Sequence, residues 1–133
     1  MKLRITPDGL PIYQQIINQV KYLAASGRLV PGDELPAIRV LAEQLLVNPN
    51  TVAKAYRELE AQGVVESRHG SGTYLSREGS PLKKKELLKA LQERTDTLLA
   101  EGLQMGIELE EILEMVRQRY ENMQISHNKK GDK

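Results

Sequence analysis

The chain has 133 residues, no cysteine and a net charge of +1, which exclude disulfides, thiolate metal sites and a polycation that coats nucleic acid indiscriminately. The length suits one ordinary domain, or one small domain with an appendage. Without cysteine, a signal peptide or an apolar run of membrane-spanning length, we expect a cytoplasmic protein with no membrane partner.

The N-terminal part of the chain predicts three helices in succession. Apolar residues at helical spacing indicate the first over residues 10–25, and Gly27 ends it. A loop with two prolines leads to the second helix, over 37–46. Asn48 is a good N-cap, followed by proline at the first helical position, for a third helix over 49–62. The short connection between the last two helices predicts a helix-turn-helix.

A β-hairpin and two further helices complete the predicted chain. Strands at 64–68 and 73–75 flank a glycine-rich tip, and the later helices cover 82–103 and 107–123. The fold class we expect is mostly α with a small β wing: a winged helix-turn-helix followed by a C-terminal two-helix hairpin. The polar tail over 126–133 is expected to be disordered.

The C-terminal helices carry more apolar residues than they can bury against each other. The surplus must pack on another surface, so we interpret the hairpin as a dimerisation element; the alternative is packing back onto the winged helix. The predicted domains are a DNA-binding domain over 1–78 and a helical dimerisation region over 79–125. The predicted dimer interface consists of Leu91, Leu98, Leu99, Leu109, Ile112, Leu113, Val116 and Tyr120.

The candidate DNA-binding residues lie at the start of the second helix, around the third helix and at the hairpin tip. The dipole of the third helix attracts anions to its N-terminus, and Arg or His beside a glycine-rich tip suits a narrow minor groove. The cationic, small polar and glycine residues at these places are Arg39, Asn48, Asn50, Thr51, Lys54, Arg57, Arg68, His69, Gly70, Ser71, Gly72 and Thr73.

Each group of candidates has a structural alternative. The outward side of the third helix could be a solvated face, Arg39 could pair with Glu43 four residues on, and the tip could be an ordinary turn. The order of helix, turn, helix and wing favours DNA contact over these alternatives. The periodicity of Tyr56 indicates a core residue rather than a contact.

Nothing in the sequence indicates catalysis or a cofactor. The only histidines are His69 and His127, and no cluster of carboxylates or histidines has metal-ligand spacing. The glycine-rich tip is not followed by a helix, so it is not a phosphate-binding loop. We therefore expect a protein that is not an enzyme and that needs neither metal nor cofactor.

The segment over residues 11–75 resembles the DNA-binding domain of the GntR family of bacterial transcription regulators. The resemblance is carried by Pro31-Gly-Asp-x-Leu-Pro36, Arg39, Leu41-Ala42, Thr51-Val52, Gly63 and Gly70-x-Gly72-Thr73. The segments Pro11–Ile16 and Asn48–Val52, with the short C-terminal part, are similar to the YtrA branch of that family. This branch implies a homodimeric regulator, usually a repressor, often of a neighbouring transporter operon.

The resemblance also implies DNA contacts at Arg39, at Asn50, Thr51 and Lys54, and at residues 68–72. Two departures from the family matter. Ala37 stands where many members have a serine that would cap the second helix, a cap typically worth about 0.5–2 kcal/mol. Many members also have arginine at or near the position before Thr51, where this chain has Pro49, Asn50 and Ala53, so a base preference cannot be inherited.

We therefore expect a homodimeric, sequence-specific repressor on an inverted-repeat operator of double-stranded DNA, with the third helix in the major groove and the wing in the minor groove. A small-molecule effector, if there is one, is unknown and would sit at the dimer interface or between domains, because the hairpin leaves little room for a pocket. Two other classes stay open. A protein-interaction module would leave the cations scattered or paired, and an architectural DNA binder is disfavoured by near-neutral charge.

Overall fold

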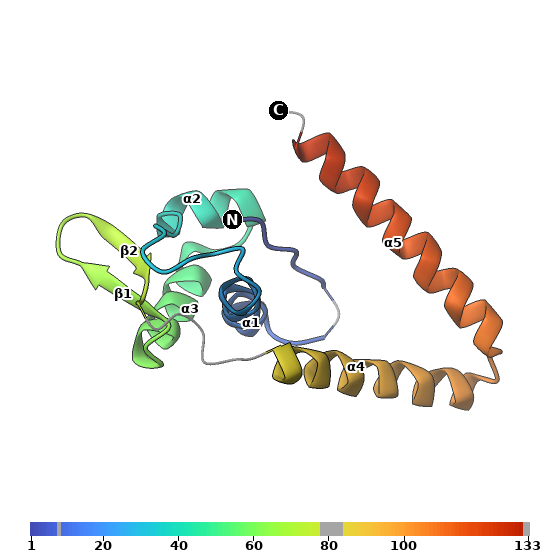
Figure 1. Cartoon of the computed structure of the whole chain (residues 1–133). Helices are drawn as coiled ribbons and strands as arrows, with labels where there is room; N and C mark the ends of the chain where they lie inside the picture. The colour runs from blue at the N-terminus through green and yellow to red at the C-terminus, as the bar shows by residue number, and fades with distance from the viewer. Residues whose placement is uncertain (8, 78–83, 132–133) are drawn as a thin grey trace. The chain divides into compact units, whose positions relative to one another are not determined.

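The computed structural model describes residues 1–7, 9–77 and 84–131, with side chains except at 84 and 125–131. These residues form two compact units, Met1–Leu88 and Lys89–Lys133. The first unit holds three helices and two strands: α1 (Ile12–Ala25), α2 (Ile38–Leu45), α3 (Pro49–Ala61), β1 (Val65–Arg68) and β2 (Gly72–Leu75). Helix α3 packs against α1 and α2 and leads into β1 (Figure 1). The predicted winged helix-turn-helix is confirmed.

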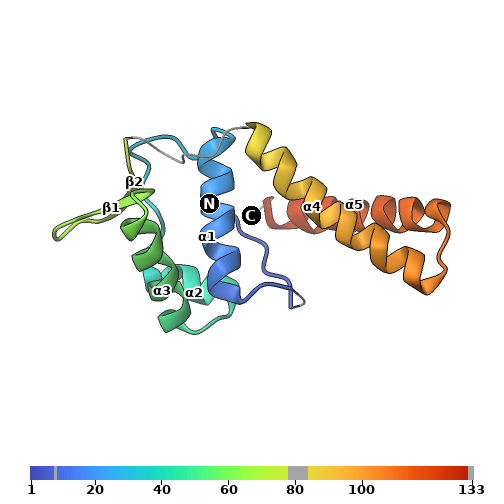
Figure 2. The same ribbon diagram turned by 90° about the horizontal axis from the view of Figure 1, so that it is seen from below.

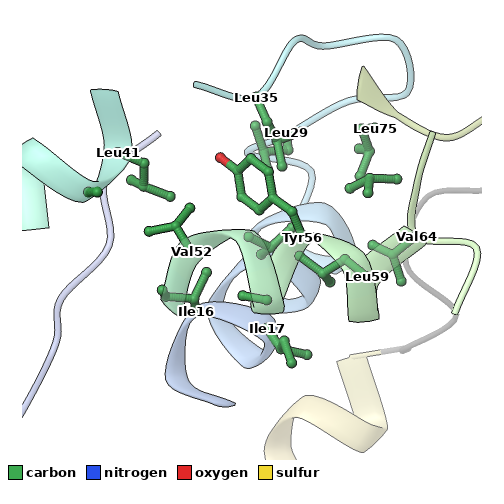
Figure 3. Packing of buried hydrophobic residues seen from close by; sticks show 14 residues of the cluster. Ile16, Ile17, Leu29, Leu35, Leu41, Val52, Tyr56, Leu59, Val64 and Leu75 are labelled. Carbon is green, nitrogen blue, oxygen red and sulfur yellow. The ribbon is translucent and has the colours of Figure 1, made fainter. Parts of the chain in front are cut away.

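Aliphatic side chains from every element of the first unit meet in one core (Figure 3). Its largest fully buried residues are Ile16, Ile17, Val20, Leu41, Val52, Leu59, Val64 and Leu75. The predicted inner face of α3 is buried, including Ala55 and Tyr56, which leaves Asn50, Lys54 and Arg57 exposed. Burial of one face of α3 therefore fixes which of its side chains point outward.

The turn between α2 and α3 is tight because α2 ends in a left-handed residue. Leu46 has a φ of 57°, and no other non-glycine residue of the described chain has a positive φ. Helix α3 then starts at once, because the side-chain oxygen of Asn48 accepts the backbone amide of Asn50 at 2.8 Å, as expected of an N-cap. Ala37 gives α2 no side-chain cap, so the predicted loss of that cap is confirmed.

The wing is supported on both edges of β2. Strands β1 and β2 pair antiparallel, with Glu66 opposite Tyr74 and Arg68 opposite Gly72. The loop before α2, which the sequence indicated only as a connection, runs along the other edge of β2. Glu34 forms a bridge with Tyr74 there, and backbone hydrogen bonds of 2.8–2.9 Å join the two segments. The wing is therefore anchored to the loop before α2 as well as to α3.

Tyr56 ties the start of α2 to α3, and we expect Tyr56→Phe to destabilise the fold. Its hydroxyl donates to the carbonyl oxygen of Pro36 at 2.7 Å, and burial raises the pKa of this tyrosine well above its usual value. Removing the hydroxyl leaves a carbonyl without its partner, so the free energy of unfolding should fall by about 1 kcal/mol. Urea denaturation at neutral pH measures this change.

The pH dependence of the Tyr56 variant provides a second readout. Because the folded-state pKa of Tyr56 is raised, the protonated hydroxyl contributes fully to the free energy of unfolding below the unfolded pKa of about 10. This contribution is lost as the pH rises through and beyond that value. The Phe variant should therefore lose less stability than the wild type above about pH 10. Tyr22→Phe, at a half-buried tyrosine, is the control. Equal unfolding midpoints for wild type and Tyr56→Phe would contradict this role.

Two long helices form the C-terminal part of the chain. They are α4 (Lys84–Met105) and α5 (Leu109–Gly131), and Gly106 joins them with a φ of +71°. The amide of Ile107 donates to the carbonyl of Gly102 at 2.9 Å, which closes α4 in the manner of a glycine C-cap. The helices diverge away from this turn in Figure 1, and Figure 2 shows the same pair of helices from below. The predicted two-helix hairpin is confirmed.

The bounds of the C-terminal helices differ from the predicted ones. Helix α5 continues to Gly131, so most of the segment predicted as a disordered tail, 126–133, is helical where it is described. The physical reason is that no proline or glycine interrupts the chain between Met123 and Lys130, and polar residues propagate a helix that has already begun. The predicted domain boundary after residue 78 lies outside the described residues.

Candidate nucleic-acid interface

The first turns of α3 present polar and cationic side chains on one side of the helix. Asn50, Lys54 and Arg57 are exposed and Thr51 is half-buried. Asn48 uses its side-chain oxygen to cap the helix, so its observed function is to order the helix end. The helix dipole creates a positive potential where Asn50 and Thr51 lie. This arrangement can bind phosphate or read the edge of a base.

Arg39 lies in the first turn of α2 and is exposed. Within the described part of the chain its side chain has neither a hydrogen bond nor an ion pair, so the pairing with Glu43 that the spacing allowed is not formed. A cation in the first turn of a helix opposes the dipole and gains nothing from it. Arg39 is therefore available to an external anion, and α2, which carries it, packs directly against α3.

Lys54 is held by an aromatic ring from a different helix. Its ammonium nitrogen lies 3.8 Å from the ring centroid of Tyr13, near the start of α1. A cation–π contact of this kind contributes about 0.5–1 kcal/mol at an exposed site. The ring restrains the side chain without neutralising its charge. Tyr13 was not among the predicted site residues, because no local pattern links α1 to the outward side of α3.

The wing cation also has intramolecular partners. The guanidinium carbon of Arg68 lies 4.1 Å from the ring centroid of Tyr74, and its Nη2 lies 3.6 Å from Oε1 of Glu66. Both charged side chains are about half exposed. The sequence predicted an arginine free to contact DNA, whereas the structure shows one that must exchange its partners to do so. Tyr74 and Glu66 were not predicted to take part.

The tip of the wing has the open geometry that the sequence predicted. Gly70 and Gly72 have φ values of +77° and +133°, His69 and Ser71 are exposed, and Thr73 is half-buried. The Tyr74 hydroxyl donates to Oγ of Ser71 at 3.3 Å. The tip is therefore small, and the hydrogen bond from Tyr74 restrains it where it joins β2. Its backbone can approach another surface closely.

The C-terminal helices leave most of their apolar residues uncovered. Of the predicted interface residues, Leu99 is half-buried and Ile112 is buried within its own hairpin. A Cβ on Gly102 would lie 2.6 Å from Cδ1 of Ile112, so the two helices touch closely at this point. The exposed apolar residues are Leu88, Leu91, Leu98, Leu103, Met105, Leu109, Leu113, Met115, Val116, Tyr120 and Met123.

Other classes of site have little support in the described ranges. No three histidine, aspartate or glutamate side chains lie close enough there to hold a metal ion. No helix among the same residues is both long and apolar enough to cross a membrane. Among the described residues, the polar and cationic side chains that lie on neighbouring elements are those of the winged helix described above.

Comparison with known proteins agrees with this geometry. Residues 12–75 match the family described as "Bacterial regulatory proteins, gntR family". The chain is 39% identical to the HTH-type transcriptional repressor YtrA of Bacillus subtilis over 132 residues, which cover 98% of this chain and 97% of that protein. This chain belongs to the GntR family and is YtrA-like. The resemblance stated from the motifs is confirmed.

Solved structures extend the comparison. YtrA from Sulfolobus acidocaldarius, a GntR-family transcription factor, aligns with a TM-score of 0.51 and 30% identity, over 92% of this chain and 97% of that one. The DNA-binding domain of AraR in complex with operator ORX1 aligns with a TM-score of 0.50 and 28% identity, over 56% of this chain and 93% of that one. This GntR-family protein is a DNA-binding transcriptional regulator, and its relatives are regulators rather than enzymes.

Proposed function

We propose that this GntR-family protein is a homodimeric, cytoplasmic repressor that binds an inverted-repeat DNA operator. In this proposal α3 reads the major groove and the wing enters the adjacent minor groove. The observation that carries it is the outward side of α3, where a capped, exposed helix N-terminus is followed by Lys54 and Arg57. Arg39, on the neighbouring α2, adds a cation without an intramolecular partner among the described residues.

Sequence reading is assigned to the first turn of α3. Asn50 can donate to and accept from adenine in the major groove, and Thr51 can contact either a base edge or a methyl group. Lys54 and Arg39 are assigned to phosphates, which fix the register of the protein on the duplex. The wing residues 68–73 are assigned to the minor groove, where Arg and His meet negative potential and glycine permits close approach.

Dimerisation is assigned to the helical region over residues 79–125, and DNA binding to residues 1–78. The exposed apolar residues of α4 and α5 support this division, because a surface of this kind is characteristic of a protein–protein interface. Two helix-turn-helix units in a symmetric dimer meet half-sites about one helical turn apart, which requires an inverted-repeat operator. The name of the B. subtilis relative, a transcriptional repressor, supports repression as the regulatory outcome.

Selection of bound sequences from a random duplex pool tests this proposal. At about 150 mM salt, binding that depends only on phosphate contacts is suppressed. We expect enrichment of an inverted repeat whose half-sites lie about one helical turn apart. Folded protein that enriches no sequence would contradict sequence-specific binding, and enrichment of a single unrepeated half-site would contradict the dimer.

Tyr13 provides a test of the part assigned to Lys54. Tyr13→Leu removes the ring beneath the ammonium and should weaken operator binding about two- to fivefold, since the contact is worth about 0.5–1 kcal/mol. Tyr13→Phe keeps the ring and should bind like the wild type. Fluorescence anisotropy with the selected operator measures both variants. If the Leu and Phe variants bind equally, the ring does not position Lys54.

A further inference from the structure

Two carboxylates flank the only cation on the strands of the wing. Glu66 and Arg68 lie two residues apart on β1, so they share one face of the sheet. Tyr74 is opposite Glu66 in the register, and Glu34 is opposite Tyr74 on the other edge of β2. Because directly opposed residues point to the same face, Glu66, Tyr74 and Glu34 form a row across the wing. Arg68 lies against this row.

The contacts in this row balance the charge of Arg68. Its guanidinium is 3.6 Å from the Glu66 carboxylate and is stacked 4.1 Å from the Tyr74 ring. The Glu34 carboxylate lies beside Gly72, the residue opposite Arg68, since a Cβ on that glycine would be 2.9 Å from Oε1. Neither β1 nor β2 carries another lysine or arginine. The face therefore offers duplex DNA one cation together with two nearby anions.

We propose that Glu66 is a specificity-determining residue, because its carboxylate competes with DNA for the guanidinium of Arg68. The inference rests on the proposed function, in which the wing meets the minor groove. On unspecific duplex, attraction comes from phosphate neutralisation, and an arginine already paired with Glu66 adds little to it. On the operator, base contacts by α3 place the wing in a narrow groove whose negative potential draws Arg68 away from Glu66.

Glu66→Gln removes the charge of the competitor while keeping the shape of the side chain. Arg68 can then pair with a phosphate on any sequence, so unspecific binding should gain one phosphate contact per chain. Affinity for the operator should rise about two- to fivefold, the range of an exposed ion pair, because there the wild type must break the pair with Glu66 to bring Arg68 into the groove. Affinity for a scrambled duplex should rise less, since the wild type keeps that pair on it, and its salt dependence should steepen by about 0.9 per chain. The ratio of specific to unspecific binding therefore rises.

Anisotropy titrations of the full-length protein at several salt concentrations, on the selected operator and on its scrambled counterpart, test the inference. Glu101→Gln, at an exposed site on α4, removes the same charge outside the wing and should leave the ratio unchanged. In an Arg68→Gln background, Glu66→Gln should have no further effect on the salt dependence.

Two results would overturn the inference while leaving the proposed function intact. One is an equal gain by Glu66→Gln on both duplexes, and the other is a gain that persists in the Arg68→Gln background, since neither acts through the competition. Wild-type protein that binds both duplexes equally would instead overturn the proposed function itself. That result is obtained before any variant is compared, so the two failures are distinguishable.

Discussion

Replacing Leu113 and Val116 on α5 by glutamate is expected to convert the proposed dimer into a monomer and to weaken operator binding by at least about a hundredfold. The two side chains are 43% and 48% exposed, and they lie three residues apart, on one face of the helix. At a symmetric interface each substitution puts unpaired charge into an apolar contact in both copies. A monomer then holds only one half-site, without the high effective concentration that the partner provides.

Sedimentation equilibrium measures the mass of this variant, and anisotropy measures its affinity for the operator. The matched control is Gln118→Glu with Asn122→Glu, which adds the same two charges on the polar side of α5, at positions roughly opposite Leu113. We expect the control to stay dimeric. A dimer mass for the Leu113 and Val116 variant would contradict the assignment of the interface. A monomer that keeps full operator affinity would contradict the role of the dimer in binding.

Arg39→Ala has the second largest expected effect, a loss of operator affinity of about ten- to hundredfold, in the range of one charge-assisted hydrogen bond to phosphate. The structure gives the Arg39 side chain no hydrogen bond or ion pair among the described residues, and its cation opposes the dipole at the start of α2. The substitution should therefore leave the thermal unfolding midpoint unchanged or raise it slightly. Loss of binding without loss of stability distinguishes a contact residue from a structural one.

Arg28→Ala is the control for this prediction. Arg28 is exposed in the turn after α1 and is not among the proposed DNA-binding residues, so its loss removes the same charge without the contact. Anisotropy and a thermal melt are measured on both variants. If Arg39→Ala unfolds at a clearly lower temperature, or if Arg28→Ala binds as weakly, the contact assigned to Arg39 is wrong.

Local pattern was enough to predict most of the fold. Helical periodicity and the Asn48 cap defined α3 to within about one residue of its observed bounds, because both signals arise within a few residues of each other. The glycines of the wing tip indicated positive φ values, which Gly70 and Gly72 have. The family resemblance depended on similar short motifs, and it extended the prediction to function.

The features that were not predicted depend on contacts between distant parts of the chain. Tyr13 meets Lys54 from another helix, and Glu34 pairs with β2 from a loop that carries no strand pattern. Ile112 was assigned to the dimer interface by periodicity, but a glycine on the facing helix lets it pack within its own hairpin. Sequence spacing identifies an apolar face without identifying what covers it.

The charge on the wing shows the same limit. The sequence placed Arg68 beside a glycine-rich tip and indicated a contact with DNA. The register of β1 and β2 places Glu66 and Tyr74 next to Arg68. These neighbours change how much Arg68 contributes to the free energy of DNA binding. A cation that is paired within the protein contributes to binding only by the difference between its two partners.

The measurement that tests the central claim most directly compares binding to the selected operator with binding to a scrambled duplex of the same composition. It is made at about 150 mM salt, where unspecific attraction is weak, and the mass of the complex is determined in parallel. We predict at least about a thousandfold preference for the operator and two chains on each inverted repeat. Equal affinity for the two duplexes would contradict the account, because it would leave α3 without a sequence to read.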